Sequence, residues 1–279
     1  SYLGRNPDAV AGLVRFCESV GAGVHESVPS AMNFPHDHDL CLGNQWNEPH
    51  QNEALAEADC ILVIDSDVPW IPTISRPADG APIFHIDVDP LKEKMPLWYI
   101  GAEHSFRADA ATALHQLNDA LAARPFDGAR VAERRGRFAV KSKARRDRLA
   151  ALETGNDGII TSEFLTATVR RHIDDDTIVL NEGITNYPAV SNHMAMTRPG
   201  SIFASGGGSL GWNGGAAFGA KLAAPEKTVV ALTGDGSYMF SIPASVHWMA
   251  VKYEAPFLQV VYNNRGWKAP RFSALGVHP

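Results

Sequence analysis

Two polar segments whose residues could hold a metal ion and a phosphate follow two apolar runs. The run Thr228–Leu232 leads into Gly234-Asp235-Gly236-Ser237, and the run Phe257–Tyr262 leads into Asn263-Asn264. The carboxyl ends of parallel strands lie along one rim of a sheet, and such folds bind their ligands there. The sequence therefore predicts that both polar segments face one ligand site.

The residue types in these segments suit a magnesium ion that is bound to a diphosphate. Asp235 offers a charged oxygen, Asn264 an amide oxygen and Gly266 a backbone carbonyl oxygen. Magnesium prefers octahedral oxygen coordination and usually combines one or two protein groups with substrate phosphates. The backbone N–H groups of Gly236 and Ser237 are expected to contact the diphosphate beside a helix start. Asp-Gly and Asn-Asn are common turn sequences singly, but their pairing at two strand ends favours the metal site.

The glycine-rich turn SGGGSLGWNGG permits a second interpretation. Gly206, Gly208 and Gly211 satisfy the G-x-G-x-x-G pattern of dinucleotide-binding folds, and Asp235 stands where the ribose-binding acid of that pattern is expected. Against this interpretation, Asp235 is flanked by two glycines, and Asn263-Asn264 has no role in it. The glycines more simply allow the backbone to approach a ligand closely.

Short apolar runs, separated by helical patterns, must position these segments. Runs of this kind occur at Cys60–Ile64, Ile83–Val88, Thr177–Leu180 and Ser201–Ser205. They indicate parallel sheets that are covered by helices on both faces. The predicted fold class is therefore α/β, with two doubly wound parallel-sheet domains.

The predicted domain boundaries follow changes in composition. Residues 1–125 are expected to form the first α/β domain, 126–155 a basic helical linker and 156–279 the domain with both polar segments. Within the linker, Arg130–Arg148 has nine Lys or Arg and two acidic residues, which is typical of a solvated connecting helix. Residues 32–51, which contain Pro35, Gly43 and Pro49, are predicted to form a loop, and Ser162 is predicted to be a helix N-cap.

Composition and charge limit the class of protein. The 279 residues allow two domains, and a hydrophobic content of 45% supports substantial cores. The formal charge of −6 gives no reason to expect nucleic acid or an anionic membrane as a partner. No apolar run is long enough to span a bilayer. The three cysteines lack metal-ligand spacing and are expected to be reduced, which suits a cytoplasmic location; a targeting segment before Ser1 stays open.

The paired motifs resemble the cofactor signature of thiamine diphosphate-dependent enzymes. Residues 1–125 are similar to the central domain of the acetolactate synthase and benzoylformate decarboxylase group, and the segment HIDVDP at 85–90 resembles its HIDIDP segment. Residues from about 156 resemble the diphosphate-binding domain of that group, so that the resemblance covers essentially the whole chain.

The resemblance implies a role for each site residue. It implies that Asp235, Asn264 and the Gly266 carbonyl bind Mg²⁺, and that Gly236 and Ser237 contact the diphosphate of thiamine diphosphate.

The resemblance also implies contacts from two other segments. Thr185, in the loop 183–186, is expected to contact the diphosphate. The Gly208 carbonyl is expected to accept from the pyrimidine amino group, and Leu210 to bend the cofactor. Bending brings that amino group close to the reactive thiazolium carbon, which makes its deprotonation intramolecular.

The implied activity is non-oxidative decarboxylation or carboligation of 2-oxo acids, similar to that of acetolactate synthase. The helix SIPASVHWMAVKY resembles the benzoylformate decarboxylase side, so a lyase of that kind stays open. A non-catalytic cofactor-binding relative and a nicotinamide-dependent oxidoreductase are alternatives of other classes. The implied partners are a small 2-oxo acid and further copies of the chain, in a homodimer or homotetramer with the active site between chains.

The group that starts catalysis is expected to lie outside this sequence. In the family, a carboxylate from a pyrimidine-binding domain promotes ylid formation, and nothing in this sequence resembles that domain. We therefore expect a fragment of a longer protein that is inactive alone, with the catalytic residue unassigned. Glu182 is a candidate for binding substrate or positioning water, and is equally well interpreted as a strand-end carboxylate.

Two further clusters have polar side chains that could bind ligands. His36-Asp37-His38-Asp39 has the residue types of a zinc or iron site, but adjacent residues rarely all reach one ion, and a structural loop is the preferred interpretation. Asp65, Asp67 and Trp70 follow a predicted strand and are candidates to line a nucleotide cleft. The resemblance leaves FAD or ADP on this domain undecided.

Overall fold

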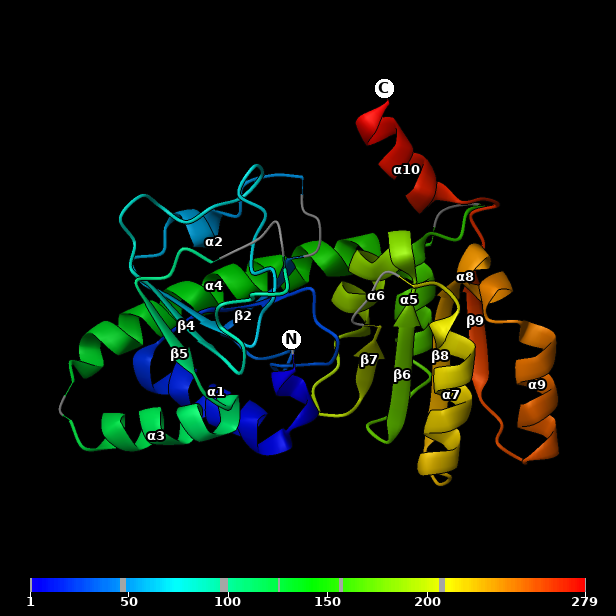
Figure 1. Ribbon diagram of the computed structural model, residues 1–279, viewed down its shortest axis with the longest axis horizontal. Coiled ribbons are helices and arrows are strands. Elements are labelled where there is room, and N and C mark those ends of the chain that lie inside the picture. Colours follow the sequence, from blue (N-terminus) through cyan, green and yellow to red (C-terminus); the bar gives the residue numbers. More distant parts are fainter. Residues whose placement is uncertain are drawn as a thin grey trace. The chain divides into compact units, whose positions relative to one another are not determined.

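The structure is a computed structural model that describes residues 2–45, 49–95, 100–124, 126–155, 158–205 and 209–278. The chain divides into two compact units, Ser1–Arg145 and Arg146–Pro279 (Figure 1). Both units contain parallel strands and helices, which confirms the predicted α/β fold class. Within the described ranges, no helix is both long enough and apolar enough to cross a membrane.

The first unit contains two small parallel sheets. One pairs β1 (Val24–Ser27) with β2 (Cys41–Gln45). The other has the order β3-β4-β5, formed by Ile61–Ile64, Ile83–Asp87 and His104–Arg107. A core of Leu55, Val63, Trp70 and Ile100 lies against this second sheet. The helical elements of the unit before residue 125 are η1 (Leu3–Arg5), α1 (Pro7–Val20), α2 (Glu53–Ala56) and α3 (Ala110–Ala122).

Local sequence signals explain where α1 begins and ends. The Asn6 side chain accepts a hydrogen bond from the Asp8 N–H, and Pro7 occupies the first turn, where its missing N–H has no consequence. Gly21 ends the helix with a φ of 65°, a conformation that disfavours residues with a Cβ. Gly12 lets α1 approach α3, because a Cβ there would lie 3.3 Å from the Leu114 Cβ.

Two strands of the first unit were not predicted from the sequence. β2 lies within the predicted loop 32–51, and β5 lies where no strand was predicted. Pro35, Gly43 and Pro49 concealed β2, in which Gly43 takes a φ of 101° and the pairing with β1 is irregular. Every residue of β5 is exposed, so it has no apolar run to mark it.

The predicted basic linker is the long helix α4, Gly128–Leu152. Several of its polar side chains bond to earlier residues of the first unit. Ser142 Oγ donates to the Cys41 carbonyl at 2.8 Å, and Lys141 Nζ lies 2.6 Å from Glu57 Oε2. These residues form a helix as predicted, in which Ser142 is buried and the Lys141–Glu57 pair is exposed.

The second unit is built on one four-stranded parallel sheet of order β7-β6-β8-β9. Its strands are β6 (Thr177–Glu182), β7 (Ile202–Ala204), β8 (Thr228–Gly234) and β9 (Leu258–Tyr262). Residues 229–232 of β8 are at most 1% exposed, which explains the continuous apolar run of this central strand.

Helix α7 packs against β6 and β8, and its Ala217 joins a core with Leu180, Val229 and Ala231 (Figure 1). The helical elements of the unit after α4 are α5 (Ser162–Arg170), η2 (Ile184–Asn186), α6 (Tyr187–Met194), α7 (Trp212–Ala223), α8 (Asp235–Phe240), α9 (Pro243–Lys252) and α10 (Lys268–Val277). The N-cap of α5 is Thr161, whose side chain accepts from the Phe164 N–H, so the prediction of Ser162 was wrong by one residue.

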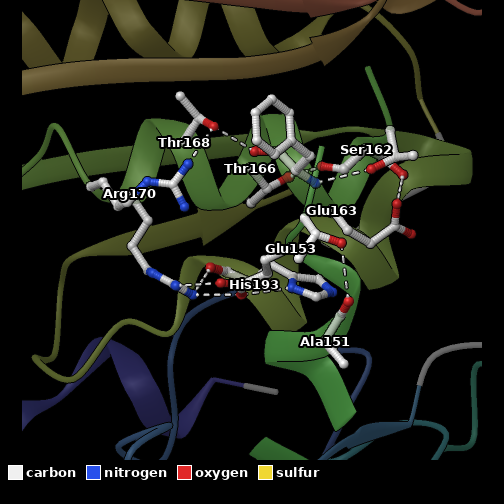
Figure 2. A network of polar contacts seen from close by, with 12 residues as sticks. Ala151, Glu153, Ser162, Glu163, Thr166, Thr168, Arg170 and His193 are labelled. Carbon is white, nitrogen blue, oxygen red and sulfur yellow. Dashed lines mark hydrogen bonds and ion pairs between the residues drawn. The ribbon is translucent and has the colours of Figure 1, made fainter. Parts of the chain in front are cut away.

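A partly buried polar network fixes Glu153, which directly follows α4, against helices α5 and α6 (Figure 2). The Glu153 carboxylate receives two hydrogen bonds from Arg170, at 3.0 and 2.7 Å, and lies 2.9 Å from His193 Nδ1. Arg170 also donates to the His193 carbonyl at 2.6 Å. Burial raises the pKa of Glu153, but the bonds from Arg170 and His193 outweigh it and hold the pKa below its ordinary value.

We predict that Glu153→Gln lowers the free energy of unfolding by about 1–3 kcal/mol, because hydrogen bonds to a charged group are lost. A carboxyl whose folded pKa is lowered stabilises the fold above its ordinary pKa of 4.5 and loses that effect as the pH falls further. Urea unfolding should therefore separate wild type and variant at pH 7 and bring them together in acid.

Glu163→Gln is the matched control, since it removes one charge from the neighbouring helix α5, where Oε2 accepts a 3.1 Å bond from the adjacent Ser162. We expect a change within about 0.5 kcal/mol for it. An equal loss in both variants would contradict the structural role of Glu153.

Candidate functional site

Three strand ends form the rim that carries the candidate site. Glu182 ends β6 and pairs in register with Thr233 of β8, while Gly234 pairs with Tyr262 of β9. The residues that follow Gly234 and Tyr262 therefore leave the sheet side by side. This register brings the predicted segments around Asp235 and Asn264 to one edge, as expected for parallel strands.

The predicted metal ligands lie on two loops that are joined by a hydrogen bond. The Gly266 N–H donates to Asp235 Oδ2 at 3.1 Å. Asn263 shapes the same loop, because its Oδ1 accepts from the Arg265 N–H at 2.9 Å while Arg265 takes a φ of 59°. The structure thus brings Asp235 and Gly266 together, 31 residues apart in the sequence.

The side-chain oxygen of Asn264 is buried and has no hydrogen-bond partner among the described residues. An unsatisfied buried acceptor costs about 1–3 kcal/mol, so such an oxygen suits an external donor or a cation. The described residues contain no group of three or more His, Cys, Asp or Glu side chains that could hold a metal. One carboxylate, one amide oxygen and a carbonyl fit a magnesium ion that takes its remaining ligands from a phosphate.

The predicted diphosphate contacts lie at the start of α8. Asp235 is the first residue of this helix, and Ser237 is only 3% exposed. Trp267 packs across the turn: a Cβ on Gly236 would lie 2.9 Å from its ring, and the ring meets Phe240 edge-on with centroids 5.3 Å apart. Gly236 thus leaves room for the Trp267 ring against the start of α8.

Glu182 is a fully buried carboxylate that binds the N-terminal end of α7. Its Oε1 accepts from the Gly211 N–H, and its Oε2 accepts from the Asn213 N–H, both at 2.6 Å. Ser237 also hydrogen-bonds to this carboxylate. Burial raises the pKa of Glu182, and the hydrogen bonds from Asn213, Gly211 and Ser237 offset only part of this effect.

This arrangement argues against the dinucleotide interpretation. In dinucleotide-binding folds the pyrophosphate occupies the N-terminus of the helix after the glycine-rich turn. Here the Glu182 carboxylate already accepts the N–H groups at that position. Gly211 has a different purpose, because its φ is 90° and a Cβ on it would lie 2.6 Å from the Phe240 carbonyl oxygen. It permits close packing of α7 on the end of α8.

Three further residues, Gly208, Thr185 and Leu210, were predicted to contact the cofactor. Gly208 lies outside the described residues. Thr185 is exposed in η2, directly after the β6 strand end, and Leu210 is half-buried just before α7. Sequence reasoning did not assign Asn213, whose side chain is buried and donates to the Leu180 carbonyl at 2.9 Å. Its partners lie far away in sequence, so no local pattern marks it.

The two histidines of the 36–39 cluster, in the first unit, bond to carboxylates of the same unit. His36 Nε2 lies 2.8 Å from Glu26 Oε2, and His38 Nε2 lies 3.4 Å from Glu18 Oε1. Glu26 also accepts from the Asn33 backbone N–H at 2.5 Å. These bonds favour the structural-loop interpretation of 36–39.

The carboxyl ends of β3 and β4 gather acidic groups. Lys92 Nζ lies 2.8 Å from Asp67 Oδ1 and 2.7 Å from Asp87 Oδ2, and Asp65 is buried close by. Burial, together with the charge of Asp87, raises the pKa of Asp65 to about 6. Trp70 lies in the core rather than in a cleft. A set of three carboxylates with one paired ammonium group does not fit a nucleotide phosphate, so we propose no FAD or ADP there.

Comparison with known proteins identifies the family. The description "Thiamine pyrophosphate enzyme, central domain" matches residues 3–117, and "Thiamine pyrophosphate enzyme, C-terminal TPP binding domain" matches residues 183–274. The chain belongs to the thiamine pyrophosphate enzyme family. This confirms the resemblance to thiamine diphosphate-dependent enzymes, because thiamine pyrophosphate and thiamine diphosphate are two names for the same cofactor.

Individual relatives are distant. The chain is 34% identical over 99 residues to benzoylformate decarboxylase from Pseudomonas aeruginosa, which covers 36% of this chain and 18% of that protein. It is 26% identical over 246 residues to acetolactate synthase isozyme 3 large subunit from Escherichia coli. This match covers 83% of the chain and 40% of that protein. The chain therefore spans less than half of the length of these relatives.

A solved structure shows the same fold. The thiamine diphosphate-dependent 4-hydroxybenzoylformate decarboxylase of Rhodococcus jostii RHA1 superposes with a TM-score of 0.69 at 23% identity, over 97% of this chain and 49% of that one. At this identity the comparison supports the fold of the thiamine pyrophosphate enzyme family and not a particular substrate.

We predict that Gly211→Ala lowers the free energy of unfolding by more than about 2 kcal/mol, because a side chain is strained at this φ and its Cβ meets the Phe240 backbone. Chemical denaturation measures the loss. Gly215→Ala is the control in the same helix, since nothing lies within 4 Å of its Cβ position. That change should be neutral or stabilise by up to about 1 kcal/mol. A neutral Gly211→Ala would contradict the close approach of α7 and α8.

Proposed function

We propose that the second unit binds thiamine diphosphate with Mg²⁺, and that the protein uses it for non-oxidative decarboxylation or carboligation of 2-oxo acids. The observation that supports this most is the buried, unpartnered Asn264 Oδ1 on the loop whose Gly266 contacts Asp235. Membership of the family supports thiamine diphosphate as the cofactor, and the Asn264 oxygen is a candidate ligand for its metal.

Each residue of the rim has a proposed part in holding the cofactor. Asp235, Asn264 and the Gly266 carbonyl would coordinate the metal, and Gly236 and Ser237 would contact the diphosphate beside the start of α8. When bound, the cofactor supplies a thiazolium that acts as an electron sink for decarboxylation.

The half-buried Leu210 has a proposed part in shaping the cofactor. It would support the cofactor's bent form.

The acid that activates the cofactor would come from another part of the assembly. The described rim offers two carboxylates at its strand ends, Asp235 and Glu182. The first is proposed to bind the metal, and the second is buried in hydrogen bonds to backbone N–H groups. Neither is free to donate a proton to the pyrimidine ring. We therefore propose an oligomer, a homodimer or homotetramer, in which this site is completed by another domain or chain.

The substrate is proposed only as a class. An acetolactate synthase-like carboligase and a benzoylformate decarboxylase-like lyase both act on 2-oxo acids, and relatives of both names match the chain. A non-catalytic cofactor-binding relative is the alternative of another class, because the rim accounts for binding without a free catalytic acid.

We predict that the chain binds thiamine diphosphate only with Mg²⁺, and that Asp235→Asn weakens binding by more than about tenfold, since each tenfold step corresponds to about 1.4 kcal/mol. Isothermal titration with and without EDTA measures both effects. Asp176→Asn is the control, because Asp176 is exposed directly before β6, at the amino end of this strand, whereas the rim lies at its carboxyl end. Metal-independent binding, or equal effects of both substitutions, would sink the proposed site.

We also predict a difference between binding and turnover. The 279-residue chain alone should bind the cofactor without sustained release of CO₂ from pyruvate or benzoylformate, whereas the natural full-length polypeptide should consume at least one 2-oxo acid of a panel. Robust turnover by the chain alone would contradict an activating acid from elsewhere. A full-length protein that binds the cofactor but consumes no 2-oxo acid would favour the non-catalytic relative.

A further inference from the structure

Glu182 connects two segments that lie far apart in the sequence. Its carboxylate binds the backbone N–H groups of Gly211 and Asn213, 29 and 31 residues away, and also receives a hydrogen bond from Ser237. One buried side chain thus joins the turn before α7 to the start of α8.

These two segments are also in close contact, which makes their spacing sensitive to Glu182. A Cβ on Gly211 would lie 2.6 Å from the Phe240 carbonyl oxygen, and one on Gly214 would lie 3.2 Å from Ser241 Oγ. Interiors packed this closely have little room to adjust when one connection changes. A shift of the turn at Gly211 would therefore displace Leu210 relative to Ser237.

The Glu182 carboxylate is bound by neutral hydrogen-bond donors, the N–H groups of Gly211 and Asn213 and the Ser237 side chain. A fully buried charge without a cationic partner is costly unless its oxygens are all satisfied. A neutral glutamine of the same shape would place an NH₂ donor against one of the two backbone N–H donors. The site therefore requires an acceptor at both oxygens, and this requirement fixes the position of the turn.

We propose that Glu182 is a positioning residue that sets the spacing between the two ends of the cofactor site. This rests on the proposed function, in which Leu210 supports the ring system of the cofactor and Ser237 contacts its diphosphate. Glu182 touches neither end of the cofactor in this role. It acts through the backbone at Gly211 and Asn213 and through the Ser237 hydroxyl.

The test compares two probes that differ in the ring system. Thiamine diphosphate needs both ends of the site, whereas inorganic pyrophosphate needs only the metal and the start of α8. Titration of each probe with Mg²⁺ into wild type and Glu182→Gln should show about a tenfold loss for thiamine diphosphate, the size expected from one lost charged hydrogen bond. Pyrophosphate binding should weaken much less than thiamine diphosphate binding, because only the hydrogen bond from Ser237 to residue 182 bears on it. A loss of fold alone would weaken both probes equally.

Amide hydrogen exchange gives a second readout that needs no ligand. At least one of the Gly211 and Asn213 amides should exchange faster in Glu182→Gln than in wild type, because one of the two oxygens that accept their N–H groups is replaced by a donor. Glu226→Gln is the matched control, since Glu226 is exposed in the loop between α7 and β8 and should leave both readouts unchanged. If Glu182→Gln does not fold, Glu182→Asp keeps the charge with a shorter reach and should show the same selective loss.

The outcomes separate this inference from the proposed function. Unchanged thiamine diphosphate binding in the variant, or equal weakening of both probes, overturns the positioning role while the proposed function stands. A wild-type chain that binds pyrophosphate but not thiamine diphosphate overturns both the proposed function and this role. Selective loss for thiamine diphosphate together with faster exchange supports the role.

Discussion

The parallel register of β6, β8 and β9 is the constraint on which the rest of the site depends. It places Glu182, Asp235 and the loop after Tyr262 at one rim, because all three strands end on the same side of the sheet. The residues of β8 are almost completely buried, so that this register is set by burial of both sheet faces rather than by the polar residues. The site can therefore hold costly groups, such as an unpartnered amide oxygen, on a framework that does not depend on them.

The sequence predicts the parts of this framework that local physics determines. The apolar runs of β3, β4, β8 and β9 were recognised from their side chains, most clearly that of β8, where burial on both faces requires apolar side chains throughout. Helix α1 has an asparagine cap and a closing glycine that are visible in the sequence. The strands β2 and β5 were missed because one contains a glycine in a left-handed conformation and the other is exposed along its whole length.

The limits at the candidate site have the same physical origin. Asp235 and Asn264 were recognised from strand ends and residue type, which are local properties, although their roles as ligands stay predictions. The structural role of Glu182 was not recognised. Its partners lie 29 and 31 residues away and are backbone N–H groups, which any residue other than proline could supply. The G-x-G-x-x-G pattern is ambiguous for a related reason. Gly211 meets the backbone of another helix, and a motif records the glycine but not what lies against it.

Of the polar side chains at the three strand ends, Asp235 is the carboxylate that a cation could bind. Glu182 is surrounded by neutral donors, and the Asn264 side chain carries no charge, which leaves Asp235 as the one carboxylate available to a metal. A diphosphate carries several negative charges, and a second free carboxylate at the rim would repel it. In the proposed site, an amide at 264 would offer an oxygen ligand without that repulsion. The backbone N–H groups of Gly211 and Asn213 offset the charge of the Glu182 carboxylate. The combination explains why a rim with two acidic strand ends remains suited to an anionic cofactor.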